Sequence, residues 1–173
     1  YETFAPDIII TSGGISHGKY EVVRNAIAMA PSLGLPIPLS WFGHVSQQPG
    51  GPQGVNVLDF NGHRLPMISF PGNPVSTLIS YVLMLRPYLR AGGPYGTPHE
   101  VASRMATLEN APRGVLVIDK PLTAPPNKRQ FLRGNLAMVE SEPGTYRVEL
   151  YPDVLPGSHL LHHAATADVL IEL

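Results

Sequence analysis

Two short loops rich in glycine and proline carry the residue types best suited to hold an anion. The first, residues 11–18 (TSGGISHG), follows an apolar run and precedes a helical pattern. Glycines let the backbone approach a ligand closely and leave successive N–H groups to point at an oxyanion. Hydroxyls and the start of the next helix add further donors. We therefore predict an anion site formed by Thr11, Ser12, Gly13, Gly14, Ser16 and Gly18. A tight turn that needs glycine for geometry alone is the alternative.

The second loop, residues 71–76 (PGNPVS), is stiffened by a proline on either side of Gly-Asn. A rigid loop presents its backbone groups without an ordering cost on binding. Asn73 suits a helix N-cap and Pro74 the first helical position, which would explain those two residues alone. Two rigid loops at the ends of two strands favour one shared crevice, to which we assign Pro71, Gly72, Asn73, Pro74 and Ser76.

Two carboxylates flank the first loop, Asp7 before it and Glu21 after it. Carboxylates beside an anion are unfavourable unless a cation such as Mg²⁺ bridges them to the ligand. The pair is therefore a candidate magnesium site. A strand-start Asp and a first-turn Glu that favours the helix dipole are the simpler reading.

Two further segments carry polar groups in suggestive patterns. Residues 47–54 (QQPGGPQG) form either a flexible surface loop or a wall for a polar ligand, with Gln48, Pro49, Gly50 and Pro52 as candidates. In residues 128–134 (KRQFLRG), alternation sends Arg129, Phe131 and Arg133 to one face. These arginines either protect a sheet edge or clamp a phosphate. No zinc pattern and no nucleophile-elbow pattern occurs.

The elements that must position these residues alternate between strand and helix. Residues 7–10 are typical of a strand buried on both faces, and apolar residues recur at helical spacing over 19–30 and 75–90. In the first helix the residues at helical spacing are Val22, Val23, Ala26, Ile27 and Ala30. In the second helix the residues expected to face the sheet are Leu78, Ile79, Val82, Leu83 and Leu85. Strands are predicted at 38–45, 54–60 and 65–70, the last two around the turn Asn61-Gly62. This order predicts an α/β layer fold.

A composition break at residues 91–98 (AGGPYGTP) predicts a linker. Beyond it the apolar period shifts toward two, with strands expected at 115–118, 136–139, 146–150 and 169–173. We expect a small β-barrel or sandwich over residues 98–173.

Composition excludes several classes of protein. The 173 residues carry 12 Lys plus Arg against 13 Asp plus Glu, a net charge of −1, so no nucleic-acid or membrane surface is indicated. No apolar run reaches the ~20 residues that cross a bilayer. Cysteine is absent, which makes a cytoplasmic origin natural. The first residue is Tyr1, and a buried-type strand follows almost at once, so we expect a fragment of a longer protein.

Five motifs, in this order, resemble the molybdopterin molybdenumtransferases, the family that includes the gephyrin E domain. They are residues 7–18 (DIIITSGGIS-x-G), 48–52 (QPG-x-P), 71–76 (PGNPVS), 129–134 (RQFLRG) and 157–161 (GSHLL). The resemblance implies that residues 1–92 are the later part of a doubly wound α/β molybdopterin-binding domain and residues 98–173 an all-β barrel domain. It further implies Mg²⁺-dependent insertion of molybdate into adenylylated molybdopterin, with release of AMP, by a cytoplasmic homodimer.

Carried over position by position, the resemblance makes Asp7 and Glu21 metal ligands and catalytic groups, with Glu21 standing where Asp is usual. Pro71 and Pro74 match the rigid loop beside the molybdate pocket, and Arg133 and Ser158 match binding positions of the β domain. Gln48 and Gly51 replace two lysines that are usual in the middle loop. The alternatives are a molybdopterin adenylyltransferase-like enzyme and a non-catalytic pterin-binding or scaffold module.

Overall fold

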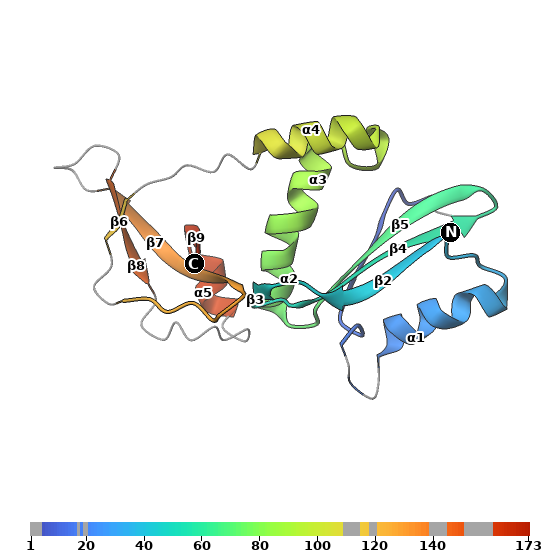
Figure 1. Cartoon of the computed structure of the whole chain (residues 1–173), viewed down its shortest axis with the longest axis horizontal. Coiled ribbons are helices and arrows are strands. Elements are labelled where there is room, and N and C mark those ends of the chain that lie inside the picture. Colours follow the sequence, from blue (N-terminus) through green and yellow to red (C-terminus); the bar gives the residue numbers. More distant parts are fainter. Residues whose placement is uncertain are drawn as a thin grey trace.

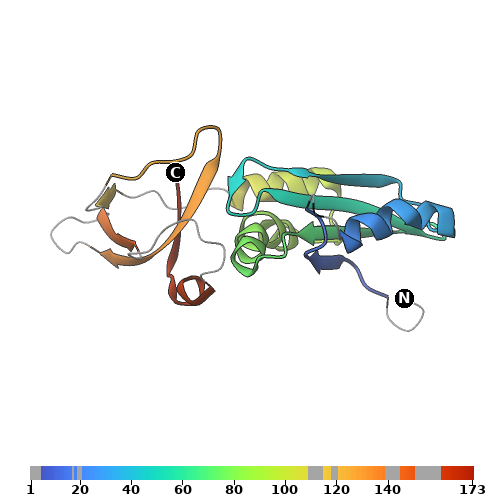
Figure 2. The same ribbon diagram turned by 90° about the horizontal axis from the view of Figure 1, so that it is seen from below.

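A computed structural model describes residues 5–16, 18, 21–108, 115–117, 121–138, 145–150 and 161–173. Two β-sheets lie at opposite ends of an elongated chain, with a helical column between them (Figure 1). The view from below shows the same separation of the two sheets (Figure 2). No helix in the described ranges is long and apolar enough to cross a membrane.

The first sheet has the strand order β1 (Ile9–Ser12), β5 (His63–Phe70), β4 (Pro52–Phe60), β2 (Leu39–His44). β1 and β5 are parallel, whereas β5, β4 and β2 form an antiparallel meander. The predicted hairpin is confirmed: Phe60 pairs with His63 across a two-residue turn in which Asn61 and Gly62 have φ of 54° and 89°. Two positive φ values match the twist of the flanking strands, which is why Asn-Gly is favoured here.

β1 differs from the expectation of a strand buried on both faces. In the described residues its recorded partner is β5, and Ile10 is 51% exposed. The α/β class is confirmed, but parallel pairing in this sheet is confined to β1 and β5: β4 and β5 are joined by a two-residue turn, and β2 is joined to β4 by residues 45–51. A short turn reverses the chain and forces antiparallel pairing.

Helix α1 (Val22–Met29) covers one face of the first sheet. Ile27 packs with Leu58 and Met67, and Val23 lies against the same cluster. Ala30, in the short helical turn that follows, is also buried. The predicted helix is confirmed, and its residues 23, 27 and 30 form the stripe that faces the sheet, whereas Val22 and Ala26, which share the helical spacing, are exposed.

The predicted helix over 75–90 is a column of three segments: α2 (Pro74–Ser80), the π-helical turn η2 (Tyr81–Leu85) and α3 (Arg86–Arg90). Pro87 has no N–H to donate to the preceding turn, which accounts for the local change of winding. Val75 and Ile79 pack against Phe131, with Leu83 beside them. The column therefore buries part of its apolar face against the second sheet, while Leu78, expected to face inward, is 39% exposed.

The second sheet has the order β3 (Gln47–Gln48), β7 (Arg129–Met138), β8 (Thr145–Leu150), β6 (Val115–Val117), and β9 (Val169–Glu172) pairs with β7. The predicted strands are present where described, and β7 begins earlier than expected. Residues 98–173 are not all β, since α4 (Pro98–Leu108) and α5 (Leu161–Thr166) lie among them. The pairings recorded among the described strands form an open path, so a closed barrel stays a prediction.

Candidate functional site

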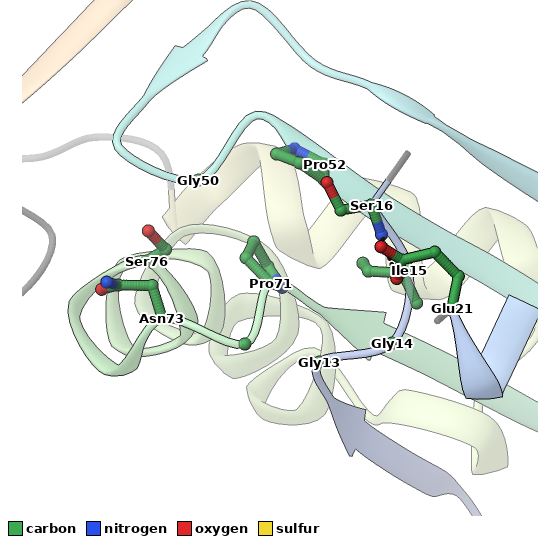
Figure 3. Close-up of a pocket in the computed structure, with 11 residues that line it drawn as sticks. Gly13, Gly14, Ile15, Ser16, Glu21, Gly50, Pro52, Pro71, Asn73 and Ser76 are labelled. Carbon is green, nitrogen blue, oxygen red and sulfur yellow. Dashed lines mark hydrogen bonds between the residues drawn. The ribbon is translucent and has the colours of Figure 1, made fainter. Parts of the chain in front are cut away.

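A cleft of about 460 Å³ opens where β1 and β5 end, within the size range of small-ligand sites. Three loops that are distant in the sequence supply its walls (Figure 3). The described lining residues are Gly13, Gly14, Ile15, Ser16, Glu21, Gly50, Pro52, Pro71, Gly72, Asn73 and Ser76. The structure thus brings together ten of the residues predicted to form the site, and adds Ile15, whose apolar side chain gave no signal for ligand binding.

The first and second loops touch through two glycines. Gly13 donates from its N–H to Phe70 O at 2.9 Å, which continues the β1–β5 pairing into the loops. A Cβ placed on Gly72 would lie 3.1 Å from Gly13 Cα, and one on Gly13 would lie 3.5 Å from Gly72 Cα. Gly13 also has a φ of 91°, which favours glycine. Part of the glycine content is therefore required by loop-to-loop packing.

Glu21 organises the far side of the glycine turn. Its carboxylate accepts hydrogen bonds from Ser16 N–H and Gly18 N–H, each at 2.8 Å. Two of the N–H groups expected to be available to a ligand are therefore already used inside the protein. Gly18 does not line the cleft, and its part in the site is to hold Glu21 in place.

The second loop is held by side chains at its two ends. Asn73 caps α2 through a hydrogen bond that its Oδ1 accepts from Val75 N–H at 3.2 Å. Thr77 donates to Pro71 O, and Ser12 Oγ also donates to Pro71 O at 3.2 Å. Pro71, Asn73 and Ser76 line the cleft, while Ser12 and Pro74 line a neighbouring hollow that is mostly apolar. Ser12 and Pro74 therefore belong to the hollow next to the cleft and not to the described lining of the cleft itself.

Three other predicted residues lie outside the cleft. Thr11 donates to Ser69 Oγ at 2.9 Å within the sheet. Gln48 belongs to β3, and Pro49 follows it through a cis peptide bond; neither is among the described lining residues, although Gly50 and Pro52 of the same loop are. The middle loop (residues 47–54) thus contributes to the cleft through Gly50 and Pro52 and not through Gln48 or Pro49.

Asp7 is not brought to Glu21. It precedes the amino end of β1, whereas the glycine turn follows the carboxyl end of that strand. Its carboxylate accepts a hydrogen bond from Tyr95, and this bond, with smaller contributions from desolvation and the negative charge, raises the pKa of the Tyr95 hydroxyl. The predicted metal site shared by Asp7 and Glu21 has no support in this geometry, because β1 lies between the two positions.

The β7 residues separate into an exposed and a buried arginine. Arg129 forms a two-pronged ion pair with Glu172, with 2.6 Å between Nη2 and Oε2, and its guanidinium lies over the Phe131 ring. β7 pairs with β3 at Arg129 and with β8 and β9 farther along, so Arg129 does not lie on an unpaired edge, and the edge-protecting alternative is not supported there. Arg133 is 3% exposed, its Nε and Nη1 have no hydrogen-bond partner among the described residues, and desolvation lowers its pKa. Ser158 lies outside the described residues.

Charge in the cleft is sparse. Glu21 is the single charged residue of the described lining. No cluster of three or more His, Asp or Glu side chains occurs in the part of the chain that the structure describes. Mg²⁺ in proteins is usually held by one or two carboxylates together with substrate phosphates. One carboxylate at the edge of a cleft otherwise lined by neutral groups fits that donor set, so Glu21 alone is the residue that would hold such an ion.

A mixed α/β sheet with glycine and proline loops at the carboxyl ends of a parallel pair defines a class of small-ligand-binding proteins. Residues 2–91 match the family model described as "Probable molybdopterin binding domain". The match covers more than half of the chain, which therefore belongs to the molybdopterin-binding domain family.

Several curated proteins are similar to this chain. Molybdopterin molybdenumtransferase 2 of Mycobacterium tuberculosis is 36% identical over 167 residues, which is 96% of this chain and 36% of that protein. Molybdopterin molybdenumtransferase 1 of the same organism is 27% identical over 167 residues, covering 95% of this chain and 34% of that protein. Gephyrin of Dictyostelium discoideum is 32% identical over 102 residues, covering 52% of this chain and 13% of that protein. The chain thus spans about a third of the length of the first two.

Proposed function

We propose that this chain forms the pterin pocket of a molybdopterin molybdenumtransferase, an enzyme that inserts molybdate into adenylylated molybdopterin. One observation carries the proposal: loops 13–16, 50–52 and 71–76, three of the motifs on which the resemblance rests, line one cleft of about 460 Å³. The relatives named molybdopterin molybdenumtransferase match along nearly the whole chain, which supports the same conclusion.

Within this proposal the residues have separate tasks. Gly13, Gly14, Gly50 and Gly72 let the backbone lie close to the pterin phosphate, and Ser16, Asn73 and Ser76 offer it hydrogen-bonding groups. Pro71 and Pro52 keep their loops rigid, so little ordering is needed on binding. Bound Mg²⁺ would neutralise phosphate charge and assist departure of AMP, and Glu21 is its candidate ligand here. Arg133 is the candidate cation from the second sheet, and Ser158 stays a candidate from the resemblance.

The division of the chain belongs to the same proposal. Residues 1–92 would be the later part of the molybdopterin-binding domain and residues 98–173 a second domain. The cytoplasmic homodimer implied by the resemblance is also proposed. The dimer is tested on a longer polypeptide that contains this chain and has the full length of the relatives. Analytical ultracentrifugation should give the mass of a dimer, and the mass of a monomer would contradict the proposal.

The activity is tested on that same longer polypeptide. Incubated with adenylylated molybdopterin, Mg²⁺ and molybdate, it should release AMP. Pterin binding without AMP release would leave the binding-module reading, and formation of adenylylated molybdopterin from ATP would point to the adenylyltransferase.

A Glu21→Gln variant examines the metal assignment. It should still bind pterin but lose Mg²⁺-dependent AMP release, because the amide is a poor Mg²⁺ ligand. Unchanged kinetics would remove Glu21 from the metal site. Glu100→Gln is the matched control: Glu100 is an exposed carboxylate in the first turn of α4, outside the described lining of the cleft, and its loss should leave turnover unaltered.

A further inference from the structure

A second hollow of about 460 Å³ adjoins the cleft, since Gly72 belongs to the described lining of both. The rest of its described lining comes from β1, from Phe70 and from one face of the helical column. No charged residue occurs in that lining, whereas the lining of the cleft contains Glu21. The hollow therefore suits an uncharged part of a ligand whose charged part lies in the cleft.

The helical column contributes apolar side chains to the hollow. Leu78, Tyr81 and Leu85 line it, at spacings of three and four residues that bring side chains to one side of a helix. Leu85 and Phe70 are buried at its base, being 2% and 1% exposed, but Leu78 and Tyr81 are each 39% exposed. On β1, Ile10 is 51% exposed. Three large apolar side chains around one hollow thus remain in contact with solvent, which is typical of a surface that a ligand covers.

Two hydroxyl groups add hydrogen-bond acceptors to the hollow. Ser12 and Thr77 both line it, and their hydroxyl oxygens lie 3.0 Å apart. Each hydroxyl donates to Pro71 O, that of Ser12 at 3.2 Å. Because the two hydrogens are directed to that carbonyl, oxygen lone pairs are what these hydroxyls can offer to a ligand. The hollow therefore favours a ligand that carries an N–H donor, such as the amino group of a heterocycle.

The cleft and the hollow meet at a contact between two glycines. Gly13 lies beside the loop between Pro71 and Asn73 (Figure 3), and a Cβ on Gly72 would lie 3.1 Å from Gly13 Cα. Gly13 lines the cleft and Gly72 lines both spaces, so neither position places a side chain between them. A narrow linker between two ring systems can therefore pass from the cleft to the hollow over this contact.

These features match the two-part substrate of the proposed function. Adenylylated molybdopterin carries a pterin at one end, an adenosine at the other and a pyrophosphate between them. The pterin and its phosphate are assigned to the cleft, so the adenosine is the part that the hollow can take. Adenine is flat, uncharged at neutral pH and bears an amino group, and bases bind to proteins largely by stacking on aromatic rings such as that of Tyr81.

We propose that the hollow between β1 and the helical column binds the adenine ring of adenylylated molybdopterin. The ring packs against Leu78 and Tyr81, and its amino group donates to the hydroxyl oxygens of Ser12 and Thr77. The inference rests on the proposed function and adds to it a subsite for the end of the substrate that is released as AMP.

The test titrates the 173-residue chain with AMP and follows the binding by NMR. Intermolecular nuclear Overhauser effects should connect the adenine protons to the Leu78 methyl groups and to the Tyr81 ring, and these resonances should shift in a saturable way. Inosine monophosphate carries an oxygen where adenine has its amino group. It should bind roughly fivefold more weakly, which corresponds to about 1 kcal/mol, because it lacks the donor.

Leu78→Ala and Leu89→Ala form a matched pair. Both leucines belong to the helical column and are 39% and 40% exposed, but Leu89 lies outside the described lining of the hollow. Leu78→Ala should weaken AMP binding roughly fivefold because part of the apolar contact with the ring is lost. Leu89→Ala should bind AMP like the wild type. Urea unfolding of both variants shows whether a difference in affinity comes from a difference in folding.

Several results would overturn the adenine subsite. They are failure of AMP to bind, AMP binding without contacts to Leu78 or Tyr81, equal affinity for AMP and inosine monophosphate, and equal affinity in Leu78→Ala and Leu89→Ala. Contacts between Leu78 and added 6-hydroxymethylpterin in place of AMP would assign the hollow to the pterin ring and overturn it as well.

The proposed function is judged separately. The pterin pocket stands in each of those cases if pyrophosphate still shifts the amide resonances of Gly13 and Gly14, which line the cleft. A chain that binds neither AMP, pyrophosphate nor pterin contradicts both proposals.

Discussion

Gly13 and Gly72 lie in backbone contact, so close that a Cβ on Gly72 would stand 3.1 Å from Gly13 Cα. The contact joins the two loops at the ends of β1 and β5 into one wall of the cleft. Backbone atoms on both sides leave no flexible side chain to move aside. The spacing between the two loops is therefore set by the absence of side chains at Gly13 and Gly72.

Gly72→Ala should push the two loops apart. Overpacking of a tight contact costs about 1–3 kcal/mol, and the resulting displacement should also lower the affinity for the pterin ligand. Urea unfolding and calorimetric titration measure the two effects. Gly34→Ala is the control: Gly34 has a φ of 86° and no neighbouring atom within 4 Å of its Cβ position, so it should lose stability without losing affinity. Wild-type affinity in Gly72→Ala would contradict the prediction, because it would show that the two loops can move apart without a loss of binding.

Asn73→Asp separates capping from ligand binding. Aspartate caps a helix about as well as asparagine, so the free energy of unfolding should change by less than about 0.5 kcal/mol. A second carboxylate in the lining of the cleft should repel an anion, however, and lower its affinity at least ~fivefold, because two like charges 4 Å apart repel by about 1 kcal/mol even at the dielectric constant of water. Asn73→Ser keeps a cap without charge and should lose less affinity than Asn73→Asp. Equal binding by Asn73→Asp would place Asn73 away from the anion.

Arg133→Met tests whether the buried guanidinium serves a ligand. Burial lowers the pKa of Arg133, and two of its nitrogens lack hydrogen-bond partners in the described part of the chain, so its charge is a cost to folding at neutral pH. Replacing it should leave stability unchanged or raise it by about 1 kcal/mol or more, while lowering pterin affinity in the longer polypeptide.

The neighbouring arginine supplies the comparison for that variant. Arg129→Met alters an exposed residue of the same strand, paired with Glu172, and should leave pterin affinity unchanged. A large loss of stability in Arg133→Met would instead show that Arg133 supports the fold of the second sheet.

Glu172→Gln should have a small effect that depends on pH. The hydrogen bond from Arg129, aided by its charge and opposed by desolvation, lowers the pKa of the Glu172 carboxyl below its ordinary 4.5. Such a group contributes stability that is fully present above pH 4.5 and is lost as pH falls through its folded-state pKa. Since the two side chains are 65% and 47% exposed, the difference at pH 7 should stay below about 1 kcal/mol.

Thermal unfolding across this pH range measures that difference. Wild type and Glu172→Gln should converge in acid and also at high salt, because an exposed ion pair is screened. A difference that persists at low pH would mean that the amide changes packing and that the ion pair is not its cause.

Local chemistry made several features of the fold predictable. The Asn61-Gly62 turn follows from two residues that tolerate positive φ, and the start of α2 from an asparagine followed by proline. Helix α4 was missed although its signal is present: Thr97 and Glu100 form reciprocal hydrogen bonds, the spacing of a capping box. The glycines of residues 92–96 favour a linker, and this signal outweighs the capping signal of α4 that follows it.

Features that depend on distant partners were not predictable. Gln53 Nε2 donates to Ser80 Oγ, 27 residues later in the chain, and nothing local specifies that contact. The orientation of the 75–90 column depends on Phe131 in the second sheet. Asp7 was placed near the site because it is close in sequence to the glycine turn, but a strand carries its two ends apart.

The two-residue strand β3 has a mechanical consequence. Gln47 and Gln48 pair with Arg129 and Gln130 of the second sheet, and the chain then continues directly into Gly50 at the cleft. A rotation of the second sheet about the helical column must either carry this segment with it or break the pairing. The width of the cleft is thereby coupled to the orientation of the second sheet, because Gly50 moves with that sheet for as long as the β3–β7 pairing holds.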